Sequence, residues 1–143
     1  MPRLTTPYTA GLPILRLAID GPKGARDIGG VVDSGADCTL LPMAVAESLG
    51  IPSEDLTPTP GGSGGAGGVW FPTWALPYSL TARVIAPFER GDELWGPDLA
   101  LQPEFAKHED TVALFGRVDF FSTYTVIFDQ PAGAFHIEYP DQS

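Results

Sequence analysis

Apolar and polar residues alternate over several short stretches of this chain, which is the pattern of half-buried β-strands. The first stretch begins at Leu12 and places Leu15, Leu17 and Ile19 on one face, with charged residues on the other. The turn-forming residues of 21–24 follow directly and predict the end of that strand. The opening of the chain therefore predicts a strand and a tight turn.

Further stretches of this kind follow, together with one short helix. Strands are expected at about 28–32, 69–76, 78–85, 111–115, 123–129 and 134–139. The last two flank a Gln-Pro-Ala-Gly turn and predict a hairpin. Pro42 and Gly50 mark the start and the end of a helix over 43–49. Residues 86–110 show no clear period and predict a long loop with at most one turn of helix. These elements predict one all-β domain over 1–143, with about seven strands and no internal repeat.

The composition agrees with a folded globular protein. Apolar residues make up 43% of the chain and charged residues 18%, and 17 glycines with 15 prolines favour turns over long helices. The net charge of -10 repels phosphate backbones, so no nucleic acid is expected as a partner. We expect no signal peptide and no membrane span. The single Cys38 cannot form an internal disulfide, which favours a reducing compartment and a cytoplasmic location.

Asp33 is the first candidate for chemistry. It follows the apolar pair Val31-Val32 and precedes Ser34-Gly35, a small pair that permits a tight turn. A carboxylate at the end of an apolar strand is costly unless it is hydrogen-bonded or shares a proton with another carboxylate. By itself, Asp-Ser-Gly is also a common turn tripeptide, and the residue can be a turn aspartate that bonds its own backbone.

Three segments of the chain together resemble the retropepsin family, the retroviral-type aspartic proteases. Val31–Asp37 is similar to the family's apolar-apolar-Asp-Thr/Ser-Gly-Ala motif, which is often followed by a second Asp. Gly61–Ala66 is similar to its glycine-rich flap, and Ala113–Arg117 to its apolar-apolar-Gly-Arg element. The three occur in the family's order and cover roughly 12–139. The apolar tail at 120–129 also resembles compact, single-lobe relatives found in bacteria.

The resemblance implies a single-lobe acid-protease fold, a closed β-barrel with one short helix, which works as a homodimer. It implies hydrolysis of a peptide or protein substrate without a metal or another cofactor. Two carboxylates must share one proton in this reaction, one activating water and the other donating a hydrogen bond to the carbonyl oxygen. The chain carries one such motif, so Asp33 from two identical chains would form the pair.

The resemblance also assigns supporting roles around the catalytic carboxylate. Ser34 would hydrogen-bond across the dimer axis, and Gly35 would let the backbone approach the substrate. Ala36 completes the loop, and Asp37 would form an ion pair with Arg117 that braces it. On charge alone, two solvated side chains are an equally good interpretation of that last pair.

The glycine-rich run is expected to form a substrate-binding flap over about 61–76. Its tip would include Gly64, Gly65, Ala66 and Gly67. This run is longer than is usual in the family, and residues 86–110 resemble an insertion. The alternative for the run is a disordered linker.

Other functions stay open on the sequence alone. The same fold could serve as a non-catalytic peptide-binding or dimerisation module. A carbohydrate-active enzyme could use two carboxylates of one chain, such as Asp33 and Asp119. Cys38 could in principle pair with His108 or His136, although a lone Cys beside an apolar run is more often a core residue. Two His and one Cys, widely spaced, give no metal-ligand pattern.

Overall fold

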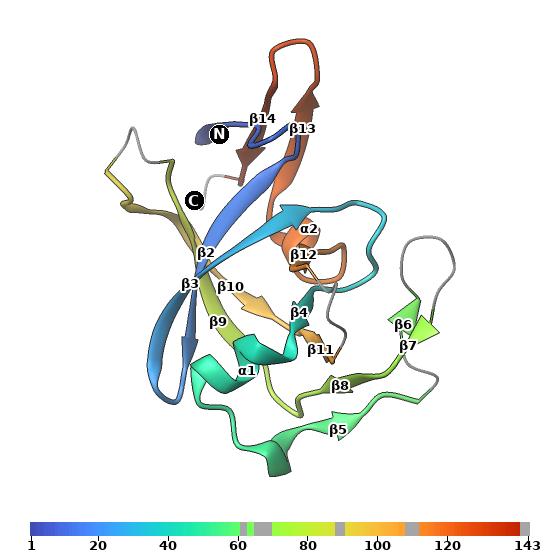
Figure 1. Ribbon diagram of the computed structural model, residues 1–143. Helices are drawn as coiled ribbons and strands as arrows, with labels where there is room; N and C mark the ends of the chain where they lie inside the picture. The colour runs from blue at the N-terminus through green and yellow to red at the C-terminus, as the bar shows by residue number, and fades with distance from the viewer. Residues whose placement is uncertain (61–62, 65–69, 88–90, 108–111, 141–143) are drawn as a thin grey trace.

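The computed structural model describes residues 1–60, 63–64, 70–87, 91–107 and 112–140 (Figure 1). The strands are β1 Arg3–Pro7, β2 Ile14–Gly21, β3 Gly24–Val32, β4 Leu40–Pro42, β5 Thr57–Pro58, β6 Ser63–Gly64, β7 Trp70–Phe71, β8 Thr73–Ala75, β9 Leu80–Ile85, β10 Leu94–Leu101, β11 Glu104–Ala106, β12 Leu114–Phe115, β13 Thr125–Asp129 and β14 Ala134–Glu138. The helices are α1 Met43–Leu49, the 3-10 helix η1 Ser53–Asp55 and α2 Phe120–Thr123. The chain is therefore mostly β-structure with a few short helices, and it carries more helix than the single segment expected.

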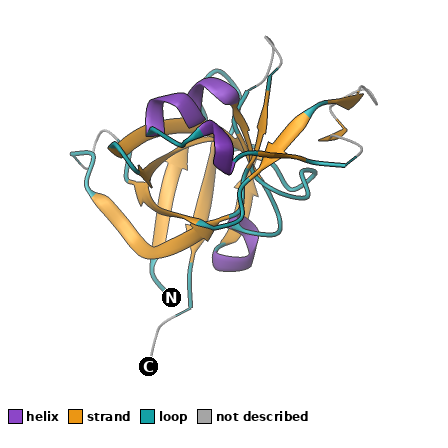
Figure 2. Ribbon diagram, turned by 90° about the horizontal axis from the view of Figure 1, so that it is seen from below, coloured by secondary structure: helices purple, strands orange, loops and turns teal. Residues whose placement is uncertain are grey.

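Most strands belong to one sheet of order β10-β9-β2-β3-β12-β4-β11-β8-β5. The long hairpin of β2 and β3 is antiparallel from Ile14↔Val31 to Gly21↔Gly24, which confirms the turn expected at 21–24. The short β12 lies between β3 and β4 and runs parallel to β3. Figure 2 shows the strands curving around a common interior. Among the described residues the end strands β10 and β5 do not pair with each other, so closure of the barrel stays a prediction.

A separate three-stranded sheet joins the two ends of the chain. Its order is β1-β14-β13, and both pairings are antiparallel. The β13–β14 hairpin expected around the Gln-Pro-Ala-Gly turn is confirmed. β1 was not anticipated, because Leu4 and Thr6 are its only buried positions and two positions define no period.

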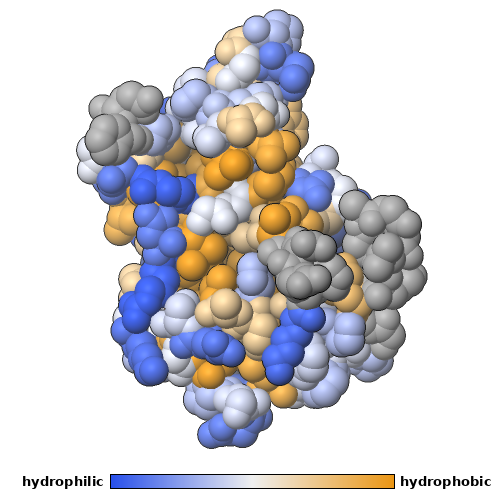
Figure 3. All heavy atoms as spheres, viewed as in Figure 1, coloured by the Kyte–Doolittle hydropathy of each residue, from blue (hydrophilic) through white to orange (hydrophobic). Residues whose placement is uncertain are grey.

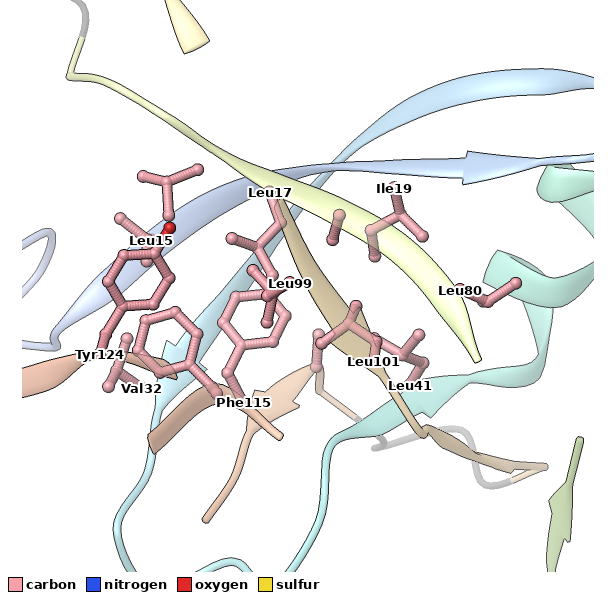
Figure 4. Packing of buried hydrophobic residues seen from close by; sticks show 14 of the residues in the cluster. Leu15, Leu17, Ile19, Val32, Leu41, Leu80, Leu99, Leu101, Phe115 and Tyr124 are labelled. Carbon is pink, nitrogen blue, oxygen red and sulfur yellow. The ribbon is translucent and has the colours of Figure 1, made fainter. Parts of the chain in front are cut away.

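The hydrophobic core lies between the curved strands (Figure 4). Leu15, Leu17 and Ile19 of β2 are at most 1% exposed, as their alternation predicts. Val32 and Phe115, from the neighbouring strands β3 and β12, are buried beside them. Burial of apolar surface is the main stabilising contribution to such a fold, and this core holds the ends of β3 and β12 in place.

Helix α1 begins and ends where the sequence predicts. Gly50 follows it in the left-handed conformation, with φ of 77°, and its N–H donates to Glu47 O. Glycine adopts this conformation without a steric penalty, which explains why the helix stops there. In the described part of the chain, no helix is long and apolar enough to cross a membrane.

The expectation of a long loop over 86–110 is wrong. This segment supplies β10 and β11, and Leu99 and Leu101 of β10 are buried. The pairing of β10 with β9 shifts register between Trp95 and Leu99, where Gly96 has φ of 79°. The irregularity interrupts the alternation by which a strand is recognised in sequence. That the segment is an insertion relative to the family stays a prediction.

Candidate active site

Asp33 lies directly after the end of β3, in a tight turn that its own side chain stabilises. Its carboxylate oxygen Oδ1 accepts a hydrogen bond from the Gly35 N–H at 2.8 Å. Its backbone O accepts from the Ala36 N–H at 3.2 Å, and its own N–H donates to Phe115 O at 3.0 Å. The side chain is half-buried. The carboxylate is therefore fixed at a strand end with one oxygen, Oδ2, that makes no hydrogen bond within the described residues.

The backbone that follows β12 lies against the loop that begins with this turn. Arg117 N–H donates to Ala36 O at 2.9 Å, and Val118 N–H donates to Asp37 O at 2.8 Å. Gly116 is required for this approach, because a Cβ there would lie 2.4 Å from Cys38 O. The Gly-Arg element thus supports the candidate active-site loop, residues 33–38, through hydrogen bonds that the missing Cβ of Gly116 permits.

Asp37 and Arg117 form the expected ion pair. Their side chains are 83% and 59% exposed in the single chain. An ion pair in water contributes less than about 1 kcal/mol, so most of the support for the loop comes from its backbone hydrogen bonds. That the pair braces a working site stays a prediction.

Ser34 and Gly35 are both exposed at the surface of the single chain. The Ser34 hydroxyl has no hydrogen-bond partner among the described residues. Asp33, Ser34 and Gly35 therefore present a carboxylate, a hydroxyl and bare backbone on one surface turn.

Asp119 has a structural role that the sequence did not reveal. Its carboxylate accepts hydrogen bonds from Thr39 Oγ1 at 2.8 Å, Gln102 N–H at 3.1 Å and Phe120 N–H at 2.8 Å. It is 5% exposed and caps α2 at its N-terminus. A carboxylate engaged in this way is not available to a substrate, which counts against a single-chain pair of Asp33 and Asp119.

Cys38 does not form a thiol–imidazole pair in the described residues. Its thiol donates to Glu104 Oε2 at 2.9 Å, and burial together with this carboxylate raises the thiol pKa to about 12. His136 lies on β14, where its Nδ1 is 2.8 Å from Thr5 Oγ1. His108 lies outside the described residues. A thiol with this pKa is a poor nucleophile at neutral pH.

A pocket of about 490 Å³ lies at the Cys38 end of the candidate active-site loop. Cys38 and Val118 line it from the loop side, Leu76 from the chain after β8, and Glu104 from β11. Asp33 is not among the residues that line it. Among the described residues, no cluster of His, Cys, Asp or Glu is arranged to hold a metal ion.

The expected flap is described only at its base. β6 and β7 pair antiparallel, with Ser63 opposite Phe71 and Gly64 opposite Trp70. Figure 1 shows this hairpin standing apart from the main sheet. The expected tip residues Gly65, Ala66 and Gly67 lie outside the described residues.

Comparison with known proteins supports the fold. No protein-family model matches the sequence, and no curated protein matches it. A solved structure, a retropepsin-like aspartic protease from Rickettsia conorii, resembles this chain with a TM-score of 0.65 and 14% sequence identity. The likeness covers 96% of this chain and 91% of that one. At this identity it shows the fold, and the resemblance to retropepsin-like proteases expected from the three motifs is confirmed at that level.

Proposed function

We propose that this protein is an aspartic endopeptidase in which Asp33 from each of two identical chains forms the catalytic pair. The observation that carries the proposal is the turn after β3. It holds the Asp33 carboxylate with one oxygen bonded to the Gly35 N–H, within a retropepsin-like fold. The fold by itself supports a peptidase of the retropepsin-like type, and the proposal adds the catalytic residue and the dimer.

The chemistry requires one ionised and one protonated carboxyl. The ionised Asp33 takes a proton from a water molecule, whose oxygen attacks the peptide carbonyl carbon. The protonated Asp33 of the other chain donates a hydrogen bond to the carbonyl oxygen and stabilises the charge that develops there. The C–N bond then breaks, and the leaving nitrogen takes the proton that came from water. Two like charges at close range favour this shared-proton state.

A second chain is needed because the sequence carries the Asp-Ser-Gly motif once. Asp119 is engaged in its own hydrogen bonds, whereas Ser34 keeps a hydroxyl for a partner. Large apolar side chains outside the pocket are also exposed in the single chain, among them Ile127 at 38% and Phe128 at 43%. Figure 3 shows hydrophobic residues gathered near the middle of one face. Association of two copies would cover apolar surface of this kind.

A peptide would bind extended between the loop and the flap. Such binding adds a strand and satisfies the peptide's backbone groups whatever its side chains. The β6–β7 hairpin, with Gly64 at the start of the glycine-rich tip, would close over it.

Substitution of the catalytic residue tests the proposal directly. Asp33→Asn should abolish hydrolysis of a random peptide library and leave the fold intact, because Asn cannot transfer the proton. The matched control is Asp20→Asn, which makes the same charge change at an exposed position of β2. Hydrolysis by Asp33→Asn at the wild-type rate would remove Asp33 from the mechanism.

Assembly is tested by dilution and by mixing. Hydrolysis should fall with the square of protein concentration below the dimer dissociation constant, and excess Asp33→Asn chains should inhibit the wild type. The pH profile should be bell-shaped, since one carboxyl must be protonated and the other ionised. Constant specific activity in a demonstrated monomer would refute the shared site. Binding of peptides by a wild-type dimer that hydrolyses none of them would favour the non-catalytic module.

A further inference from the structure

Glu104 is a half-buried carboxylate whose contacts are all with neutral groups. Its Oε1 accepts from Thr73 Oγ1 at 2.6 Å, and its Oε2 accepts from Cys38 Sγ at 2.9 Å. Within the described part of the chain no cationic group lies within ion-pair distance of it. Lys107, three residues further on, lies instead over the ring of Trp74, 5.8 Å from its centroid. A carboxylate in such a position is normally paired with a positive charge.

The pocket beside Glu104 has a volume of about 490 Å³, and its lining combines apolar side chains with this acidic one. Ala75, Leu76, Pro103 and Val118 give it apolar walls, and Glu104 supplies the acidic group. Arginine and lysine combine an apolar stem with a cationic head, and they bury the stem against apolar surface. Arginine also donates hydrogen bonds in a planar fork that matches a carboxylate.

We propose that this pocket binds an arginine or lysine side chain of the peptide substrate, with Glu104 as the residue that determines the preference. The proposal rests on the proposed function for the peptide itself. Cys38 and Val118, which line the pocket, belong to the two segments that build the active-site loop. In this proposal, an extended peptide that lies over Asp33 places a side chain a few residues from the cleaved bond into the pocket. The net charge of -10 would also attract basic peptides to the protein.

Binding to the wild-type protein tests the pocket without any need for hydrolysis. N-acetyl-arginine amide should shift the backbone amide NMR signals of Cys38 and Glu104, and should bind about tenfold more tightly than N-acetyl-citrulline amide. Citrulline has nearly the same shape and no charge, so the ratio measures the contribution of the cation. Equal affinities, or no shift at these residues, would overturn the proposal.

Two variants then assign the effect to Glu104. Glu104→Gln should reduce the arginine-to-citrulline ratio to about one, whereas Asp20→Asn should keep it, although both remove one negative charge. A ratio that survives Glu104→Gln would show that another group recognises the cation. If Glu104→Gln does not fold, the comparison of the two ligands on the wild type decides alone.

Measurements of peptide cleavage distinguish a failure of the arginine pocket from a failure of the proposed protease activity. With peptides that differ only in having arginine or citrulline at the position that occupies the pocket, kcat/KM should differ about tenfold. Glu104→Gln should remove this difference. Cleavage without this difference would overturn the role of Glu104 and leave the protease intact. Binding of arginine through Glu104 in a protein that cleaves no peptide would overturn the protease and keep the site.

Discussion

Replacing Gly116 by alanine should displace the loop that carries Asp33. The added Cβ would lie 2.4 Å from Cys38 O and 2.8 Å from Ala36 O. Even close C–H···O contacts keep carbon and oxygen about 3.3 Å apart, so the loop must move by about 0.5–1 Å. Both oxygens belong to the backbone, and no side-chain rotation can relieve the contact.

A movement of this size weakens the hydrogen bonds between the two segments. These are Arg117 N–H to Ala36 O at 2.9 Å and Val118 N–H to Asp37 O at 2.8 Å. Each contributes about 1 kcal/mol net, and steric overpacking adds about 1–3 kcal/mol. The free energy of unfolding should therefore fall by about 3–5 kcal/mol. Displacement of the Asp33 turn should also reduce hydrolysis at least about a hundredfold.

Urea unfolding of a matched pair of variants measures the effect. Gly29→Ala makes the same substitution at an exposed position of β3, where the nearest atom to the new Cβ, Arg16 Cγ, is 3.9 Å away. That control should be unchanged or slightly more stable, because alanine restricts the unfolded chain. Equal urea midpoints for Gly116→Ala and Gly29→Ala would refute the close approach of Gly116 to the loop.

Three further predictions concern the support of the loop. Asp119→Ala should lower the free energy of unfolding by about 3–5 kcal/mol in urea, because it leaves three donors without their acceptor; a loss below about 1 kcal/mol would contradict the buried network. Arg117→Ala should lower the free energy of unfolding by less than about 1 kcal/mol in the same assay, since its pair with Asp37 is exposed. Its rate of hydrolysis should fall by more than this loss of stability explains. A loss of stability as large as that of Asp119→Ala would contradict the exposed position of the pair. Iodoacetamide should label Cys38 in the folded protein at pH 8 at least about a hundredfold more slowly than in the unfolded chain, because its pKa is raised from 9.0 to about 12 and the thiolate is the reactive form. Glu104→Gln should speed this labelling, and equal rates in folded and unfolded protein would contradict the Cys38–Glu104 contact.

The elements that were predicted correctly have signals within a few residues of one another. Pro42 and Gly50 bound α1, and the alternation of Leu15, Leu17 and Ile19 marks β2. A strand of strict period or a helix with both ends marked needs no knowledge of its neighbours.

The elements that were missed depend on contacts far away in the sequence. β10 is a strand because it pairs with β9 across an irregularity at Gly96, and Tyr124 donates its hydroxyl to Pro97 O at 3.0 Å from another part of the chain. Asp119 is a cap and a buried acceptor because Thr39 and Gln102 reach it from other segments. The role of Glu104 likewise depends on the fold, which places it beside Cys38. No local pattern carries this information.

The structure gives a physical reason why separate weak motifs identify this fold together. The Asp33 turn places the carbonyl groups of Ala36 and Cys38 where only a residue without a Cβ can approach, and Gly116 is that residue. The next residue, Arg117, then donates its N–H to Ala36. An Asp-Ser-Gly turn and a Gly-Arg pair about 80 residues later are therefore two halves of one packing arrangement. All these hydrogen bonds are made within one chain. In the proposed dimer, each chain would therefore contribute a loop that is already formed, and the partner would add the second carboxylate.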